Sequence, residues 1–260
     1  MRHALVALLA LATPAAAALS PSQLQDVSAT PPPGARLPAG LRFIDQYGRP
    51  FTLQAAPVPT ILLFADYTCN HLCGPGITLT AGALHDAGLV TPRDYRFIVI
   101  GMDQDGPAKA RKLIDDRLDG LDDVRRSIRL LTGTPATVAA AEKALGYHAV
   151  YDKAVDQFAH DAESYVFTPD GRLSRMLPET AVTPALLKGA IAAAAKGDVV
   201  PPKAPGNALS SFVAVCYGFA AAHGVHGRTI VILLQTLGVL TLAGIALMIW
   251  RLVRRARAQA

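Results

Sequence analysis

Residues 60–76 read Thr-Ile-Leu-Leu-Phe-Ala-Asp-Tyr-Thr-Cys-Asn-His-Leu-Cys-Gly-Pro-Gly, and the predicted domain is organised around them. The apolar run 61–64 predicts a short buried strand. The chain then turns through Cys69 and Cys73, and the Gly-Pro-Gly that follows separates the strand pattern from a helix predicted over 77–88. Two thiols are therefore expected where a core strand passes into a helix, a junction at which α/β proteins commonly place functional groups.

The spacing of the two cysteines leaves their chemistry open. On one helical turn, residues four apart have β-carbons about 5–6 Å from each other. This separation is wider than the roughly 3.5–4.5 Å between β-carbons in a disulfide, so it favours two sulfurs converging on one metal ion. The adjacent glycines would also permit an irregular turn that closes a disulfide. From the residues alone, metal binding, redox chemistry and inert thiols all remain possible.

Both ends of the chain carry targeting signals. Residues 1–18 have a basic start, a short apolar run and a final series of alanines, which predicts a secretory signal peptide. Residues 229–250 contain no charge and as a helix would extend about 33 Å, enough to cross a bilayer. The arginine-rich tail over 251–260 predicts a cytoplasmic C-terminus. We therefore expect a single-pass protein of the cell membrane whose main domain lies on the periplasmic, extracytoplasmic side.

The charge balance argues against nucleic-acid binding. The formal net charge is +5, and Arg2 together with four arginines of the tail supplies five of the 25 basic residues. The other 20 basic residues balance the 20 acidic residues, so the exported domain is expected to be near neutral. Three cysteines are also too few for a disulfide scaffold.

The order of elements predicts one α/β domain over residues 41–198. It follows an irregular lead-in over 19–40 and precedes a linker and juxtamembrane segment over 199–228. The further predicted elements are a hairpin (41–53), a central parallel strand (95–102), two helices (107–118 and 135–145), a short strand (147–151), a second hairpin (164–176) and a last helix (183–196). A thioredoxin-like mixed sheet flanked by helices is the expected architecture.

Four further side chains could carry chemistry. Asp103 and Asp105 follow the central strand, and we interpret them as caps of the next helix rather than as cation ligands. His71 lies between the two cysteines but would point to another side of a helical turn, so it is expected to be exposed. Cys216 precedes the predicted membrane span, and three roles stay open for it: shuttle for a metal ion, partner in an interchain disulfide, or small apolar residue.

Several motifs accompany the two cysteines in this chain. They are Thr-Cys-x-x-x-Cys at 68–73, Val-Ile-Gly-Met-Asp at 99–103, Leu-Thr-Gly-Thr-Pro at 131–135, and His160 shortly before Tyr-Val-Phe-Thr-Pro-Asp-Gly-Arg-Leu at 165–173. With these motifs the chain resembles, over about residues 41–195, the Sco/SenC family of copper-handling proteins with a thioredoxin fold.

The resemblance implies a copper site and a set of partners. It implies that Cys69, Cys73 and His160 bind one copper ion, as Cu(I), Cu(II) or both. It also implies that the protein delivers copper to the dinuclear copper centre of cytochrome c oxidase or reduces the thiols there. The expected partners are the copper-bearing oxidase subunit or another cuproprotein, other copper chaperones, and the membrane through the C-terminal helix. Two thiolates and an imidazole form a soft ligand set that suits Cu(I).

A rival hypothesis makes Cys69 and Cys73 a catalytic redox pair. The protein would then be a thiol–disulfide oxidoreductase that reduces the cysteines of a partner, and His160 would not be required. A peroxide-reducing enzyme of the same fold is a weaker alternative, because no Thr-x-x-Cys peroxidatic pattern with a supporting arginine is evident.

Overall fold

The structure is a computed structural model, and it describes residues 19, 21–68, 73–103, 106–153, 156–200, 236–242, 244, 250, 251 and 254. The predicted signal peptide over 1–18 lies outside these residues. Most of the predicted linker over 199–228 and of the predicted membrane span over 229–250 also lies outside them. In the part of the chain that the structure describes, no helix has both the length and the apolar character needed to cross a membrane.

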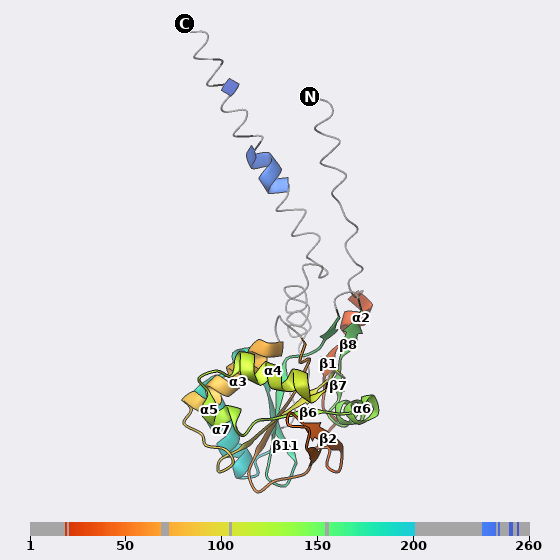
Figure 1. The fold of residues 1–260 in the computed structure, drawn as a ribbon, viewed down its shortest axis with the longest axis vertical. Helices are drawn as coiled ribbons and strands as arrows, with labels where there is room; N and C mark the ends of the chain where they lie inside the picture. The colour runs from red at the N-terminus through yellow and green to blue at the C-terminus, as the bar shows by residue number, and fades with distance from the viewer. Residues whose placement is uncertain are drawn as a thin grey trace.

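A mixed sheet of seven strands forms the centre of the domain, in the order β11-β10-β4-β5-β6-β2-β3 (Figure 1). The strands are β2 (Arg42–Asp45), β3 (Pro50–Thr52), β4 (Thr60–Ala65), β5 (Arg96–Gly101), β6 (Arg129–Thr132), β10 (Glu163–Phe167) and β11 (Leu173–Pro178). Strands β4, β5 and β6 are parallel, and all other pairs in this sheet are antiparallel. The two predicted hairpins thus form the two edges of the sheet.

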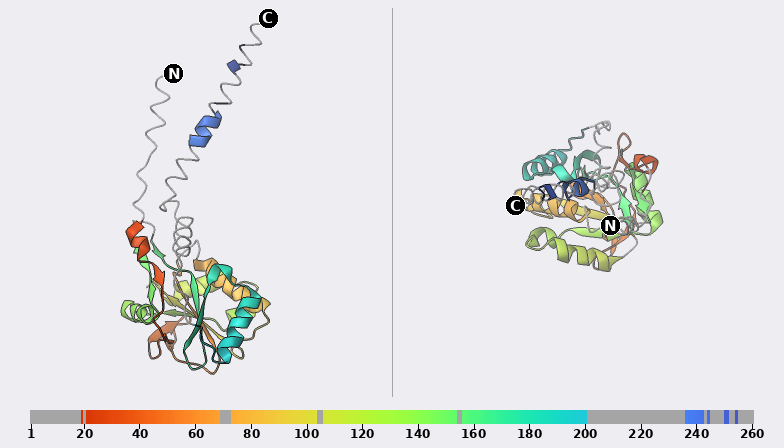
Figure 2. Two further views of the ribbon diagram at one scale, coloured as in Figure 1. Left: turned by 180° about the vertical axis from the view of Figure 1, so that it is seen from behind. Right: turned by 90° about the horizontal axis from the view of Figure 1, so that it is seen from above.

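Helices cover both faces of the sheet. They are α3 (Cys73–Asp86), α4 (Pro107–Arg117), α5 (Asp122–Arg125), α6 (Pro135–Ala144) and α7 (Pro184–Ala195). Seen from above, α3 lies between α7 and α4 (Figure 2), and these three helices share one core layer. Helix α6 packs against the opposite face. The predicted class, a thioredoxin-like mixed sheet flanked by helices, is confirmed.

The apolar run in β4 follows from its central position. Every residue of β4 is buried. Ile61 and Leu63 pack in the layer that holds α3, α4 and α7, whereas Leu62 and Phe64 pack in the layer that holds α6. Because successive side chains of a strand point to opposite faces, a strand covered on both sides needs apolar residues at every position.

The predicted element boundaries shift by a few residues in the structure. Helix α3 begins at Cys73, four residues earlier than expected. Thr134 caps α6 as predicted, because its hydroxyl accepts a hydrogen bond from the Thr137 backbone N–H. The strand expected over 147–151 is divided into β7 (Tyr147–His148) and β8 (Val150–Asp152), and β8 pairs with β9 (Gln157–Ala159).

The lead-in over residues 19–40 is not irregular throughout, which corrects the sequence-based expectation. It contains helix α2 (Pro21–Gln25) and strand β1 (Ser28–Ala29), and β1 pairs with β7. Ala35 and Leu37 are buried in the layer that also holds α6. A segment this short is ordered by its contacts with residues far away in the chain, so its local composition did not indicate a strand.

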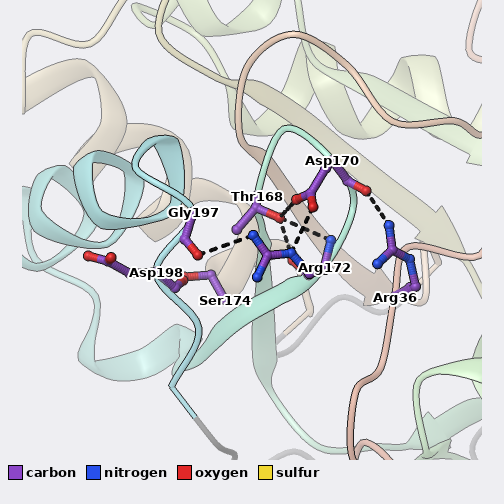
Figure 3. A network of polar contacts seen from close by, with 7 residues as sticks. All are labelled: Arg36, Thr168, Asp170, Arg172, Ser174, Gly197 and Asp198. Atoms are coloured by element: carbon purple, nitrogen blue, oxygen red, sulfur yellow. Dashed lines mark hydrogen bonds and ion pairs between the residues drawn. The ribbon is translucent and has the colours of Figure 1, made fainter.

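The turn between β10 and β11 joins both ends of the domain (Figure 3). The Arg36 guanidinium donates to the backbone carbonyl of Asp170 at 2.6 Å, which attaches the lead-in to this turn. Arg172 forms an ion pair with the Asp170 carboxylate at 2.7 Å. The Ser174 hydroxyl donates to the carbonyl of Asp198 at 2.6 Å, which attaches the segment after α7.

Candidate metal centre

The turn that follows β4 is held by a buried tyrosine. The Tyr67 hydroxyl lies 3.1 Å from the carbonyl oxygen of Val99 and 3.0 Å from that of Leu131, so the side chain spans β5 and β6. The ring occupies the space beside Gly101, where an added Cβ would lie 2.5 Å from Cε2 of Tyr67. Burial, and next the charge of Asp103, raise the pKa of Tyr67 well above its usual value, so the hydroxyl keeps its proton for these bonds.

Asp103 serves this turn rather than the following helix, which corrects the interpretation of Asp103 as a cap. Its Oδ2 accepts a hydrogen bond from the Tyr67 backbone N–H at 2.6 Å. The N-cap position of α4 is Gly106, and no side chain caps it. Asp103 follows the end of β5 and so lies beside the residues that follow β4, its parallel neighbour, where the carboxylate serves as the partner of the Tyr67 N–H. Asp105 lies outside the described residues.

Asp66 connects the same turn to the segment that carries the predicted histidine ligand. The side chain is 1% exposed, and its Oδ1 accepts from both the backbone N–H and the hydroxyl of Thr68, at 2.8 and 2.7 Å. Its Oδ2 accepts from the backbone N–H of Phe158 at 3.3 Å. Phe158 belongs to β9, two residues before His160. The carboxylate therefore links the start of the cysteine-bearing turn to the strand before His160.

The sheet register places His160 at this same edge. His160 lies between β9 and β10, and β10 pairs antiparallel with β4 through Tyr165 and Leu62. Because the two strands run in opposite directions, the start of β10 meets the end of β4. Cys73 is the first residue of α3, which follows β4 in the chain. Cys69 lies outside the described residues, as do His71 and Cys216.

His160 is half-buried and held through its Nδ1 atom. The Tyr147 hydroxyl oxygen lies 2.8 Å from Nδ1, and the backbone carbonyl oxygen of Asp161 lies 3.0 Å from it. The same carbonyl accepts a hydrogen bond from the Tyr147 hydroxyl at 2.9 Å. Three groups thus form a closed triangle of polar contacts around one nitrogen of the imidazole.

Four carboxyl groups surround this region. Burial raises the pKa of Glu142 and of Glu163 to about 7 and that of Glu179 to about 8. Burial also raises the pKa of Asp161. Interaction with His160 partly opposes the rise in Glu142, Asp161 and Glu179, since a positive imidazolium favours an ionised carboxylate. Several carboxyl groups around the imidazole therefore still carry protons at pH values close to neutral.

Glu179 also packs against the start of α3. It lies in a short 3-10 helix, η1 (Glu179–Ala181), and its side chain is 2% exposed. A Cβ on Gly76 would overlap with Oε2 of Glu179, so the absence of a side chain at Gly76 makes room for the carboxyl group. Gly76 is three residues after Cys73. A buried acid is thus placed beside the first turn of the helix on which Cys73 stands.

Three residues of this region were not predicted from the sequence. Asp66, Tyr147 and Glu179 each act through a partner that is distant in the chain, and none belongs to a motif that indicated a site. An acid directly after a buried strand, as Asp66 is, was the one available signal. Among the described residues, no group of three or more metal-binding side chains converges on a point. The joint ligation of one ion by Cys69, Cys73 and His160 stays a prediction.

Comparison with known proteins supports the fold. No protein-family model matches the chain, and no curated protein matches it. Among solved structures, a proposed electron transfer protein from Aquifex aeolicus aligns with a TM-score of 0.55 at 17% identity, covering 64% of this chain and 95% of that one. A SCO1/SenC family lipoprotein from Bacillus anthracis aligns with a TM-score of 0.51 at 19% identity, over 61% and 96% of the two chains.

A third similar structure was solved with copper bound. Arabidopsis thaliana ScoI, solved with copper bound, aligns with a TM-score of 0.50 at 15% identity, covering 61% of this chain and 96% of that chain. The domain is therefore a thioredoxin-like α/β domain in which a core strand leads into a cysteine-bearing turn. Within that class, its fold is the one found in Sco/SenC proteins.

Proposed function

We propose that this protein is a membrane-tethered copper chaperone of the Sco/SenC type, with copper as its cargo. The observation that carries the proposal is the position of His160 at the sheet edge where β4 ends, directly after a strand that Asp66 links to the cysteine-bearing turn. ScoI of Arabidopsis thaliana, which shares this fold, was solved with copper bound. The predicted ligands Cys69 and Cys73 follow the same turn.

The residues present suit copper chemically. Two cysteine sulfurs and one imidazole form a soft site that favours Cu(I), and a further ligand or water would also allow Cu(II). Zinc usually takes four protein ligands in structural sites, so a set of three favours copper. Metal binding requires thiolates, and a turn before a helix generally lowers the pKa of a thiol, which would serve metal capture. His160 supplies a nitrogen that is already held in place.

The cellular setting follows from the ends of the chain. In this proposal, residues 1–18 are removed as a signal peptide, and 229–250 span the cell membrane with the basic tail over 251–260 in the cytoplasm. The domain over 41–198 then works on the extracytoplasmic side. Its partner is the copper-bearing subunit of cytochrome c oxidase or another cuproprotein, to which it delivers copper or whose thiols it prepares. Other copper chaperones would supply the ion.

A Cu(I) titration against a competing chelator tests the proposal. It uses the reduced full-length chain with Cys216→Ser, so that the third cysteine does not contribute, alongside Cys69→Ser, Cys73→Ser and His160→Ala in the same background. We expect one tightly bound copper per chain, with affinity lost or greatly weakened in each of the three variants. Copper affinity that is unchanged in His160→Ala would reject the three-ligand site.

One observation favours a second function, a thiol–disulfide oxidoreductase. The buried carboxyl group of Glu179 lies against the first turn of α3, which puts a protonatable group beside the helix that carries one cysteine of the pair. This function predicts disulfide reduction that requires Cys69 and Cys73 but survives His160→Ala. A cysteine pair that never equilibrates with glutathione would reject it.

A further inference from the structure

The contacts among Tyr147, His160 and Asp161 indicate which ring nitrogen of neutral His160 carries the proton. The Tyr147 hydroxyl is 2.8 Å from Nδ1 of His160 and 2.9 Å from the Asp161 carbonyl oxygen, and Nδ1 is 3.0 Å from that same oxygen. A carbonyl oxygen can only accept hydrogen bonds, a hydroxyl donates one proton, and each nitrogen of a neutral imidazole either donates or accepts.

Only one of the two neutral forms of His160 satisfies all three contacts. With the proton on Nδ1, the ring donates to the hydroxyl and carbonyl oxygens, and the Tyr147 hydroxyl donates to Asp161. With the proton on Nε2, the Tyr147 hydroxyl is the only donor among the three groups, and whichever acceptor it serves, no proton lies between Nδ1 and the Asp161 carbonyl oxygen. Two lone pairs, on Nδ1 and on the carbonyl oxygen, would face each other at 3.0 Å.

The position of the Tyr147 hydroxyl does not depend on His160. The Tyr147 side chain is 3% exposed, and its ring stacks on Phe64 of β4 with centroids 4.3 Å apart and an interplanar angle of 22°. Tyr165 packs edge-on against the same ring. Strand β7, which carries Tyr147, is paired with β1. The core therefore places the hydroxyl, and the hydroxyl constrains the imidazole.

We propose that Tyr147 is a positioning residue which, with the Asp161 carbonyl, keeps the proton of neutral His160 on Nδ1 and so presents Nε2 as the metal-binding nitrogen. The proton placement rests on the triangle alone, whereas its use in copper binding rests on the proposed function. Ligating histidines commonly donate their second nitrogen to such a partner, which sets the tautomer and the ring orientation. Here the partner is a tyrosine set in the aromatic core.

The tautomer is read directly by long-range ¹H–¹⁵N correlation NMR. The sample is the reduced, metal-free full-length chain with ¹⁵N-labelled histidine, at an alkaline pH where imidazoles are neutral. The His160 signals are assigned from their disappearance in His160→Gln. The test variant is Tyr147→Phe, which keeps the stacked ring and removes the hydroxyl. The matched control is Tyr165→Phe, which removes another hydroxyl from the same aromatic cluster. The Tyr165 hydroxyl lies 3.4 Å from the Leu145 carbonyl oxygen.

We expect a single Nδ1–H tautomer in the unmodified chain and in Tyr165→Phe, and exchange between both tautomers in Tyr147→Phe. A single Nε2–H tautomer in the unmodified chain would overturn the proposal. A single Nδ1–H tautomer in Tyr147→Phe, together with unchanged copper affinity, would assign the role to the Asp161 carbonyl alone and remove Tyr147 from the mechanism.

Copper affinity, measured on the same samples, separates this inference from the proposed function. Loss of an outer partner of a metal-ligating histidine typically costs about 10–100-fold in metal affinity, and we expect a loss in that range for Tyr147→Phe and none for Tyr165→Phe. If the unmodified chain binds no copper, the proposed function fails and with it the role of Nε2 as a metal ligand. The NMR measurement uses metal-free protein, so it still tests whether Nδ1 carries the proton.

Discussion

The two ends of strand β10 are held in different ways. At its far end, the turn to β11 is held by exposed groups, such as the ion pair between Asp170 and Arg172, whose side chains are 56% and 43% exposed. At its near end, the candidate site uses buried groups far apart in the chain, and the Asp66–Phe158 hydrogen bond joins residues separated by 92 positions. The far end relies on exposed contacts, whereas the candidate site relies on buried contacts that the tertiary fold creates.

This difference predicts where substitutions matter. Exposed ion pairs are screened by water and contribute little, while buried hydrogen-bonding groups are costly to leave without partners. Changes near Asp66 should therefore affect both folding stability and copper binding. Changes in the far turn should affect neither strongly. The four predictions below test this contrast, in order of decreasing expected effect.

Replacing Asp66 by alanine should have the largest effect on stability. The change removes the acceptor of three hydrogen bonds, from the Thr68 N–H, the Thr68 hydroxyl and the Phe158 N–H. We expect a loss of about 2–4 kcal/mol in the free energy of unfolding, measured by urea denaturation, because three partly buried donors lose their acceptor. Copper affinity should fall as well. A variant as stable as the unmodified chain would show that Asp66 does not organise the site.

Replacing Gly101 by alanine should cost about 1–3 kcal/mol in the free energy of unfolding, the usual range for overpacking a core. An added Cβ would lie 2.5 Å from the Tyr67 ring, and the hydrogen bonds of the Tyr67 hydroxyl prevent the ring from moving away easily. The matched control is Gly189→Ala on α7, where nothing lies within 4 Å of the added Cβ.

The control should behave in the opposite way. Gly189 is exposed on a helix, so alanine should stabilise the protein by about 0.5–1 kcal/mol. Equal destabilisation by Gly101→Ala and Gly189→Ala in the same thermal or urea assay would mean that the effect comes from losing glycine in general, not from the contact with Tyr67.

Glu179 should give the protein a pH-dependent stability. Burial raises the pKa of Glu179 to about 8 in the folded state, above the 4.5 of an exposed glutamate. The folded state therefore holds this proton more tightly, so the stabilisation is fully present below about pH 4.5 and is lost as the pH rises through about 8. Glu179→Gln should remove part of this decline, by at least about 1.4 kcal/mol, the equivalent of one pKa unit.

Urea denaturation at pH 5 and pH 8 measures this effect. Glu142 and Glu163, whose pKa values burial raises to about 7, should contribute a decline of the same sign, so it should persist in part in Glu179→Gln. If the free energy of unfolding depended on pH in the same way in Glu179→Gln and the unmodified chain, Glu179 would be excluded as a source of the decline.

Replacing Arg172 by alanine should have the smallest effect on unfolding. The change removes its ion pair with Asp170 and its hydrogen bond to the Gly197 carbonyl at 3.3 Å (Figure 3). Because the ion pair is exposed, added salt should make the difference from the unmodified chain smaller still. Copper affinity should be unchanged. A loss of stability as large as that of Asp66→Ala would contradict the contrast between the two ends of β10.

Most of the sheet was predictable because its signals are local. The apolar runs in β4 and β5 reflect burial on both faces, and Pro169 and Asp170 before Gly171, which has a φ of 82°, indicate a tight turn. Strand β6 was not predicted. It has four residues, begins with Arg129 and leads directly into the helix-start signal at Thr134, and its pairing with β5 on one side and β2 on the other defines it as a strand.

Local patterns in the sequence indicated both hairpins, strands β4 and β5 with the helices that follow them, the cysteine-bearing junction after β4 and the histidine to test as a ligand. Periodicity, caps and turn residues depend on neighbours along the chain, so these features can be inferred from short segments. The tertiary structure alone decided that Asp66 joins this junction to the segment of His160, that Tyr147 contacts Nδ1, and that Glu179 lies beside α3. Such contacts depend on sheet register and core packing, which bring together residues whose separation in the chain carries no local signal.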